Sequence, residues 1–323
     1  MSDSDEAEPR IKVEVLERRE LTAEVVELRL GSQDGPDLPG WGPGAHIDLH
    51  LPNGMTRQYS LCGPPDDERA WTVAVMREKV SRGGSQCVWD DLVVGSRIEV
   101  GLPRNEFPLV PALRYVFIAG GIGITPLLPM VRDVSGTAAD WKLVYGGRER
   151  ASMAFASDLQ KHHPDRIELV PQDERGHIDL DAAIGEPDAE TVIYVCGPEP
   201  LISAVERATD RWRADALHVE RFVARAVAAP TGVDTAFVVA LRNGREVPVP
   251  VGVSVLAALR AEGMELASSC EGGTCGTCEV AVLGGVPDHR DEVLDDDEKA
   301  ANDAMMICVS RSLTPVLDLD LEL

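Results

Sequence analysis

The chain has 323 residues, of which 44% are hydrophobic, and a formal net charge of −24 at pH 7. This length allows two or three domains with their own cores, while the lack of an apolar run of about 20 residues argues against a membrane span. The negative charge argues against binding to nucleic acid through its phosphates. Seven cysteines and no recognisable signal peptide argue against a disulfide framework. We therefore expect a cytoplasmic protein with reduced thiols.

The first part of the chain reads as a tail followed by a small β-structure. Residues 1–9 are acidic and polar, which predicts a disordered tail. Residues 10–108 then alternate between apolar and polar positions, and we expect strands at 11–15, 47–51, 71–75 and 98–100. Many short strands separated by turns predict an antiparallel barrel.

One strand end in this region has side chains that suit a flavin. Arg57, Gln58, Tyr59 and Ser60 follow each other at the end of a predicted strand. Tyr59 offers an aromatic wall for the flavin ring, Ser60 a hydrogen bond for its polar edge, and Arg57 a cation for its phosphate. The same residue types are common on exposed strands, so this segment alone also fits a purely structural strand.

A glycine-rich segment strengthens the flavin interpretation. Ser81, Arg82, Gly83, Gly84 and Ser85 precede a helical stretch at residues 86–92. Paired glycines before a helix expose backbone N–H groups at its positive end, which favours a phosphate. The alternative is an ordinary loop with Ser85 as the N-cap of the helix. The two segments together favour a flavin site.

Residues 109–226 change to an alternation of strands and helices. Buried strands are expected at 115–119, 142–145, 167–170 and 192–195, with helical patterns between them. This alternation predicts a doubly wound parallel sheet covered by helices on both faces.

A glycine turn follows the first of these strands. Gly120, Gly121 and Gly123 lie between the strand and a helix from residue 127, where doubly wound sheets bind pyrophosphate. The pattern departs from G-x-G-x-x-G, so a tight strand–helix turn is the alternative. We expect Thr125 to cap the helix and Pro126 to take its first position.

A second turn follows the strand that ends near residue 195. It contains Cys196, Gly197 and Pro198. Because carboxyl ends of parallel strands share one edge of the sheet, both turns are expected on one rim.

The last part of the chain begins after a short linker at residues 227–233. Asn243 and Gly244 predict a hairpin turn between strands at 237–241 and 246–249, and a helix is expected at 255–262. From residue 231 onward there are 17 acidic and 6 basic side chains, with a peak at residues 295–298. This acidic run is either a solvated surface or a docking face for a basic partner protein.

Four cysteines in residues 234–323 are the most specific feature of the sequence. Cys270, Cys275 and Cys278 have the spacing C-x4-C-x2-C, and Cys308 follows thirty residues later. This is the spacing of a plant-type 2Fe–2S cluster. A structural zinc site is the alternative, although zinc sites usually have two short cysteine pairs. The other cysteines are scattered and are expected to pack as small apolar side chains: Cys62, Cys87 and Cys196.

The order of these motifs resembles the phthalate dioxygenase reductase family, to which vanillate demethylase reductases are also similar. The matching segments are residues 57–60, 81–85, 102–107, 120–126, 194–198 and the cysteine loop. The resemblance implies a flavin barrel, a nicotinamide domain and a C-terminal ferredoxin domain of the β-grasp fold. It also implies that electrons pass from NADH through FMN to the 2Fe–2S cluster and then to a separate oxygenase.

The resemblance also implies roles for individual residues. FMN contacts fall on Arg57, Gln58, Tyr59, Ser60, Gly83, Gly84 and Ser85. Nicotinamide contacts fall on Gly120, Gly121, Gly123, Thr125, Arg148, Cys196, Gly197 and Pro198. Cluster ligands fall on Cys270, Cys275, Cys278 and Cys308. Ser60 is the candidate catalytic residue, near the reactive edge of the flavin.

The predicted function is an NADH-dependent reductase that serves a Rieske-type oxygenase. One alternative keeps the same electron path but serves a haem-thiolate monooxygenase. The other, of a different class, is a zinc-bearing binding module without redox activity. FAD in place of FMN and NADPH in place of NADH stay open.

Overall fold

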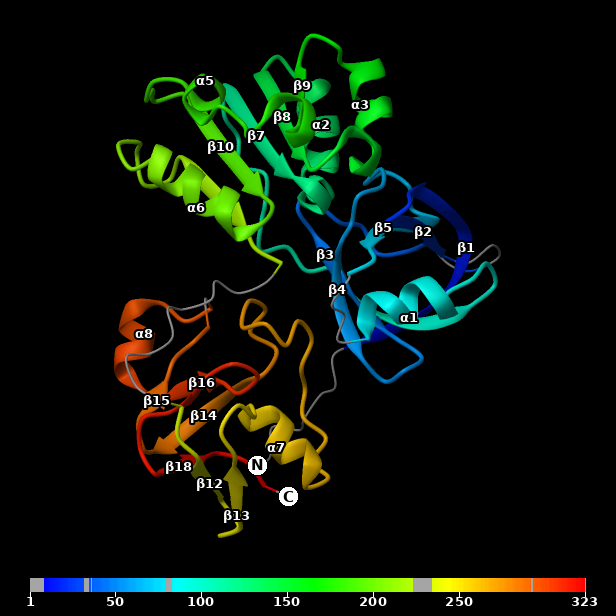
Figure 1. Ribbon diagram of the computed structural model, residues 1–323. Coiled ribbons are helices and arrows are strands. Elements are labelled where there is room, and N and C mark those ends of the chain that lie inside the picture. Colours follow the sequence, from blue (N-terminus) through cyan, green and yellow to red (C-terminus); the bar gives the residue numbers. More distant parts are fainter. Residues whose placement is uncertain are drawn as a thin grey trace. The chain divides into compact units, whose positions relative to one another are not determined.

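The computed structural model describes residues 9–31, 35, 37–78, 83–222, 234–291 and 293–322 (Figure 1). The chain divides into two compact units, Met1–Glu220 and Arg221–Leu323, and each is described by itself. The predicted linker and all but the last residue of the predicted tail lie outside the described residues. In the ranges just given, no helix is both long and apolar enough to cross a membrane.

The first unit begins with the predicted antiparallel barrel. Its six strands are ordered β4-β3-β6-β1-β2-β5. A bridge between Leu61 and Val73 joins the end of β4 to β5, so the two edges of the sheet meet and the barrel closes. The elements are β1 (Arg10–Thr22), β2 (Val25–Gly31), β3 (His46–His50), β4 (Thr56–Ser60), β5 (Ala70–Met76), α1 (Gly84–Asp91) and β6 (Arg97–Gly101).

The second half of this unit is the predicted parallel sheet, ordered β11-β10-β7-β8-β9. Its strands are β7 (Arg114–Gly120), β8 (Asp140–Gly147), β9 (Ile167–Pro171), β10 (Thr191–Cys196) and β11 (Leu217–Glu220). Its helices are η1 (Gly121–Ile124), α2 (Leu127–Ser135), η2 (Arg150–Ser152), α3 (Ala156–His162), α4 (Gln172–Arg175), α5 (Leu180–Ile184) and α6 (Glu199–Ala208).

Two successive residues of β7 show that the sheet is covered on both faces. Phe117 packs in a cluster with residues of α2 and α3, whereas its neighbour Ile118 packs in another cluster with residues of α6. Successive side chains of a strand point to opposite faces, so α2 and α3 cover one face and α6 the other, as Figure 1 shows. The predicted doubly wound arrangement is confirmed.

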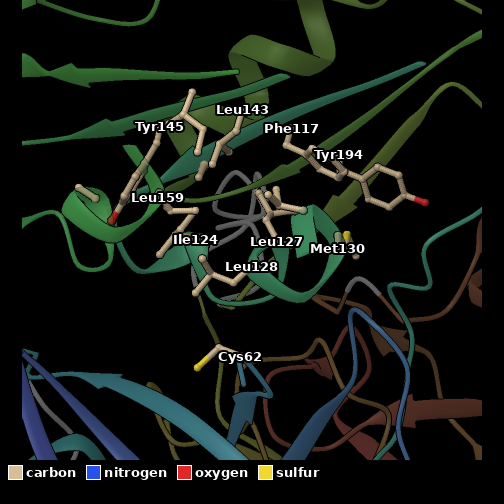
Figure 2. Packing of buried hydrophobic residues seen from close by; sticks show 14 of the residues in the cluster. Cys62, Phe117, Ile124, Leu127, Leu128, Met130, Leu143, Tyr145, Leu159 and Tyr194 are labelled. Atoms are coloured by element: carbon tan, nitrogen blue, oxygen red, sulfur yellow. The ribbon is translucent and has the colours of Figure 1, made fainter. Parts of the chain in front are cut away.

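The barrel and the parallel sheet share one hydrophobic cluster. It contains Cys62 and Phe107 from the barrel part together with Phe117 and Tyr194 of the sheet. Figure 2 shows side chains of η1 and α2, Leu128 among them, lying between the sheet residues and Cys62. The two parts are therefore packed as one body, and the predicted boundary between residues 108 and 109 stays a prediction.

The second unit is a small α+β structure. Its sheet is ordered β13-β12-β18-β14-β16, with β12 and β18 parallel and adjacent. The elements are β12 (Phe237–Leu241), β13 (Glu246–Val249), α7 (Val255–Ala261), β14 (Glu279–Gly284), β15 (Pro287–Asp288), α8 (Asp296–Ala301), β16 (Ala304–Met306), β17 (Arg311–Ser312) and β18 (Val316–Leu319). Leu256 and Leu259 of α7 are buried in one cluster with Val239 and Leu317 of the sheet. This arrangement is the predicted β-grasp fold.

The predicted hairpin in this unit is present. Gly244 has a φ of +81°, which glycine adopts without strain, and the Asn243 side chain accepts a hydrogen bond from the backbone N–H of Arg245 at 2.9 Å. The helix expected at 255–262 begins after Ser254, whose side chain accepts a hydrogen bond from the N–H of Ala257. The turn dipeptide was sufficient to predict the hairpin, and the predicted helix is present from Val255 to Ala261.

Candidate cofactor sites

The flavin candidates on β4 and α1 lie against each other. A β-carbon on Gly84 would lie 2.7 Å from Nε of Arg57, so the glycine leaves the space in which this side chain crosses the first turn of α1. The Arg57 guanidinium also donates to the Thr56 carbonyl oxygen at 2.7 Å. A cation held over the positive end of a helix suits a phosphate group. The residues present therefore fit the phosphate of a flavin nucleotide.

The start of α1 differs from the alternative considered for the sequence. Gly83 is the N-cap residue, with a left-handed φ of 104°, and Ser85 lies inside the first turn. The Ser85 hydroxyl accepts a hydrogen bond from the backbone N–H of Glu78 at 3.2 Å, so Ser85 as the N-cap is wrong. Ser81 and Arg82 of the same motif lie outside the described residues.

The other flavin candidates are set by the pairing of β4 with β3. Ser60 lies opposite His46 and is 5% exposed, and Tyr59 lies opposite Ile47. Burial raises the pKa of the Tyr59 hydroxyl above its ordinary value. Gln58 Nε2 lies 3.3 Å from His46 Nε2, and burial lowers the pKa of His46 to about 4 with a further contribution from nearby Arg104. His46 is therefore neutral near pH 7 and contacts the flavin strand as an uncharged ring.

The two predicted nicotinamide turns contact each other through their backbones. A β-carbon on Gly123 would lie 2.3 Å from the carbonyl oxygen of Cys196, and one on Gly120 would lie 2.6 Å from Cδ of Pro198. A β-carbon on Gly197 would in turn lie 3.0 Å from Cα of Gly120. Glycine is therefore required at these positions so that the ends of β7 and β10 can meet. The predicted common rim is present.

The helix after the first turn starts differently from the prediction. Thr125 Oγ1 donates to the carbonyl oxygen of Ile122 at 2.9 Å, which closes the short helix η1. Pro126 is the N-cap residue of α2, and no side chain caps that helix. The prediction that Thr125 caps α2 with Pro126 at its first position is wrong, because Thr125 is the C-cap of η1 and Pro126 is the N-cap of α2. Thr125 remains on the rim and is 2% exposed.

Two further candidates lie on the same rim. Arg148 directly follows β8, whose Gly146 pairs with Gly120, and it is exposed. Gly121 has a left-handed φ of 56°, and within the described ranges no neighbouring atom would lie within 4 Å of a β-carbon there. The space beside Gly121 and the charge of Arg148 suit a nucleotide lying across the carboxyl ends of β7 and β8.

Sequence reasoning missed a buried carboxyl on this rim. Glu220, the last residue of β11, pairs with Cys196 at the end of β10, and the two side chains are hydrogen-bonded. Its Oε2 atom is buried, and among the described residues it has no hydrogen-bond partner. Burial, with a smaller contribution from the Glu106 carboxylate, raises the pKa of Glu220 from 4.5 to about 8. The available signal was a glutamate that ends a short strand with apolar Leu217 and Val219.

The four cysteines of the second unit come together as two pairs. Cys270 is hydrogen-bonded to Cys275, and Cys278 to Cys308. The thiol of the partner stabilises the thiolate form, so the pKa of Cys270 and that of Cys278 are lowered. Within the described part of the chain, no three potential ligands converge on one point as a single metal ion requires. Two pairs of thiols suit two irons, each with two thiolates.

The loop between these cysteines directs backbone N–H groups at sulfur. The N–H groups of Gly272 and Thr274 lie 3.3 and 3.5 Å from Sγ of Cys270. Gly273 has a left-handed φ of 76°, and a β-carbon there would lie 2.7 Å from Cγ2 of Val309. N–H···S bonds of this kind tune the potential of an iron–sulfur cluster. The loop therefore fits the cluster that the cysteine spacing predicts.

A second residue missed from the sequence joins the two parts of this site. Asp291 is 2% exposed, and its carboxylate accepts hydrogen bonds from the N–H of Leu294 at 2.9 Å and from the hydroxyl of Ser310 at 3.2 Å. Ser310 is two residues from Cys308, and Cα of Asp291 lies 3.2 Å from the position of a β-carbon on Gly273. Asp291 thus connects the cysteine loop to the segment of the fourth cysteine.

Comparisons with known proteins agree with these sites. Residues 239–313 match the family described as 2Fe-2S iron-sulfur cluster binding domain, and residues 117–207 match the family described as Oxidoreductase NAD-binding domain. Phenoxybenzoate dioxygenase subunit beta of Ectopseudomonas oleovorans is 44% identical over 298 residues, which cover 91% of this chain and 92% of that protein. The solved structure of phthalate dioxygenase reductase has 34% identity and a TM-score of 0.79, and covers 97% of this chain and 98% of its own.

The chain belongs to the phthalate dioxygenase reductase family. As a member of this family it is an oxidoreductase with an NAD-binding domain and a 2Fe–2S domain, and it transfers electrons from a pyridine nucleotide to the cluster. A crystal structure of an intact type IV self-sufficient cytochrome P450 monooxygenase is also similar, with 41% identity and a TM-score of 0.78. That match covers 97% of this chain but 41% of the monooxygenase chain, so the family architecture also occurs inside a longer protein.

Proposed function

We propose that the chain is the NADH-dependent reductase of a separate Rieske-type oxygenase, a dioxygenase or a demethylase. The observation that carries the proposal is the near-complete mutual coverage with phthalate dioxygenase reductase, 97% of this chain and 98% of that one. The relative from Ectopseudomonas oleovorans is also named as a subunit of a dioxygenase. A cytoplasmic location stays a prediction of the sequence.

FMN is the flavin in this proposal, held by residues of β4 and of the start of α1. Arg57 and the N–H groups at Gly84 and Ser85 bind its phosphate, and Tyr59 and Ser60 bind its ring. A bound flavin accepts electrons in pairs from a nicotinamide and releases them singly. The work of the protein is to bind and orient the cofactor. Ser60 is proposed to lie at the reactive edge; a Ser60→Ala variant whose flavin is reduced at the wild-type rate would dismiss that role.

NADH lies across the rim formed by the two glycine turns. Gly121, Gly123 and Thr125 take the pyrophosphate side, Arg148 takes a ribose or phosphate, and the turn at residues 196–198 takes the nicotinamide. The close packing of Gly123 on the Cys196 carbonyl supports this arrangement, because it fixes one turn relative to the other. Cys270 and Cys275 are proposed as ligands of one iron, and Cys278 and Cys308 as ligands of the other.

The acidic second unit is the proposed docking face for the oxygenase. The structure gives part of the acidic run another role, because Asp295 caps helix α8 and forms a capping box with Glu298. Asparagine and glutamine preserve such caps without charge. Replacing all four residues at 295–298 by their amides should slow electron transfer to the oxygenase and reduce its salt dependence. NADH oxidation by a small dye should not change; equal losses in both assays would dismiss the docking face.

A haem-thiolate monooxygenase is the second candidate partner. The 41% identity with part of a self-sufficient cytochrome P450 monooxygenase, 41% of that chain, favours it. Reconstitution separates the two candidates: the purified reductase with NADH is combined with a Rieske-type oxygenase or with a haem-thiolate monooxygenase, and product formation is measured. Turnover that couples NADH to product with the Rieske partner supports the proposal, and coupling with the haem protein alone refutes it.

A further inference from the structure

The hydroxyl of Tyr194 makes two hydrogen bonds to the connecting segment, residues 102–113, which leads from β6 of the barrel to β7 of the parallel sheet. It donates to the carbonyl oxygen of Pro108 at 2.9 Å and accepts from the N–H of Val110 at 2.7 Å. Tyr194 itself is in the middle of β10 and is fully buried. One side chain of the sheet therefore fixes two residues of the connecting segment.

The ring of Tyr194 is held by aromatic neighbours. Phe107 contacts it edge-on with ring centroids 5.3 Å apart, and His218 stacks on it at 4.7 Å with an angle of 11° between the ring planes. Phe117 lies 5.7 Å away on the neighbouring strand. Figure 2 shows the ring beside Phe117, with the hydroxyl pointing away from the other labelled side chains. The hydroxyl is thus directed by packing toward the connecting segment.

On the barrel side, Arg104 and Asn105 of this segment are hydrogen-bonded to β3 and to the loop before it. Asn105 accepts from the N–H of Phe107 at 3.0 Å and donates to the carbonyl oxygen of Pro43 at 3.0 Å. Arg104 is paired through its backbone with His46, which lies opposite Ser60 of β4. A displacement of residues 105–110 would therefore be transmitted to the strand that carries Tyr59 and Ser60.

On the sheet side, Tyr194 is two residues from Cys196, and alternate residues of a strand point to the same face. Cys196 begins the turn that packs on Gly123. Tyr194 thus connects the strand that carries the flavin candidates with the turn that carries the nicotinamide candidates. We propose that Tyr194 is a positioning residue, whose hydroxyl sets the spacing of the two rings for hydride transfer; the inference rests on the proposed function.

The chemistry requires such a device, because a misplacement of about 1 Å can slow a reaction by about 100-fold. Tyr194→Phe keeps the ring and its packing and removes both hydrogen bonds. We expect the rate of flavin reduction at saturating NADH, measured by stopped-flow absorbance on the full-length holoprotein, to fall about tenfold or more. Flavin content and the Kd for NADH should stay at wild-type values, and the isotope effect with NADH deuterated at the transferred position should rise.

Tyr115→Phe is the matched control. Tyr115 holds the same segment with two hydrogen bonds, to the carbonyl oxygen of Val110 at 3.0 Å and from the N–H of Ala112 at 2.8 Å, but it lies at the opposite end of its strand from the rim. It should lower the Tm about as much as Tyr194→Phe and leave the reduction rate within about twofold of wild type.

Two kinetic results and one binding result would overturn the role of Tyr194. One is a Tyr194→Phe protein that reduces its flavin at the wild-type rate; the other is an equal loss of rate in both variants, which indicates general loosening. Failure of the proposed function is a different observation, since a wild-type holoprotein would then not be reduced by NADH at all. Should Tyr194→Phe bind no flavin, Tyr194 holds the barrel together and does not position the rings, which also refutes the inference.

Discussion

The carbonyl oxygen of Cys196 lies against Gly123, only 2.3 Å from the point where a β-carbon on that residue would be. Two loops that are more than seventy residues apart in the sequence thus meet backbone to backbone at the rim of the parallel sheet. The contact explains why residue 123 is a glycine, although the turn departs from the G-x-G-x-x-G pattern of dinucleotide-binding proteins. It also makes the nicotinamide site sensitive to a single methyl group.

Gly123→Ala should therefore disrupt the nicotinamide site selectively. Overpacking of this kind costs about 1–3 kcal/mol when the backbone must shift, and here the shift moves Cys196 or the turn at Gly121. We expect NADH to reduce the protein at least about tenfold more slowly, while dithionite still reduces it fully. Gly136→Ala is the control, because its β-carbon would lie 3.6 Å from the Asp133 carbonyl oxygen, an ordinary van der Waals contact. Equal rates for the two variants would contradict the assignment.

Gly84→Ala tests the flavin site in the same way. The added methyl group would lie 2.7 Å from Arg57 Nε and would push the guanidinium off the first turn of α1. We expect weaker retention of FMN, measured as flavin released into the filtrate on ultrafiltration. Gly40→Ala, whose β-carbon would have no atom of the described part of the chain within 4 Å, should retain flavin like wild type. Wild-type retention by both variants would place the phosphate elsewhere.

The raised pKa of Glu220 should make the stability of the folded protein depend on pH. Its pKa is raised from 4.5 to about 8, so the folded state holds the proton more tightly than the unfolded state. The resulting stabilisation is complete below pH 4.5 and decreases by up to about 1.4 kcal/mol per pH unit as the pH rises toward 8. Glu220→Gln cannot lose this proton. The Tm of the variant minus that of wild type should therefore increase from pH 5 to pH 8, and a constant difference would contradict the prediction.

The charge of Asp291 is expected to lower the reduction potential of the cluster. Asp291 lies beside Gly273 through its Cα and Cβ atoms and is buried, and Asp291→Asn removes the negative charge with little change of shape. Because reduction adds an electron to the cluster, the variant should have a higher reduction potential, measured by a redox titration followed by electron paramagnetic resonance. Asp303→Asn removes the same charge from an exposed position, where water and salt screen it. An unchanged potential in Asp291→Asn would refute the effect.

Much of the fold could be predicted because the local signals are strong. Alternating strands, the hairpin at Asn243 and Gly244, and buried strands followed by glycine turns each have a short-range physical cause. Cysteine spacing predicted the iron–sulfur site, since the type and the spacing of the ligands are both read from the sequence. These features need only a few neighbouring residues for their interpretation.

The remainder depends on partners that are distant in the sequence. Thr125 closes η1 instead of capping α2, because the glycine turn folds into a short helix that ends at this residue. Glu220 acquires its raised pKa only when β11 pairs with β10, and Asp291 becomes a link only when Ser310 approaches it. Tyr194 stands in a motif that the sequence identified, but its hydrogen bonds reach more than eighty residues back along the chain.

We propose that electrons pass from NADH through a flavin to a two-iron cluster within this chain. The most direct test is an anaerobic titration of the purified protein with NADH, followed by absorbance and by electron paramagnetic resonance, with iron and sulfide measured on the same sample. We predict equal iron and sulfide, bleaching of both flavin and cluster bands, and a paramagnetic signal of the reduced cluster that is absent in Cys308→Ser. A protein that contains zinc in place of iron, or whose cluster stays oxidised while NADH reduces the flavin, would contradict the claim.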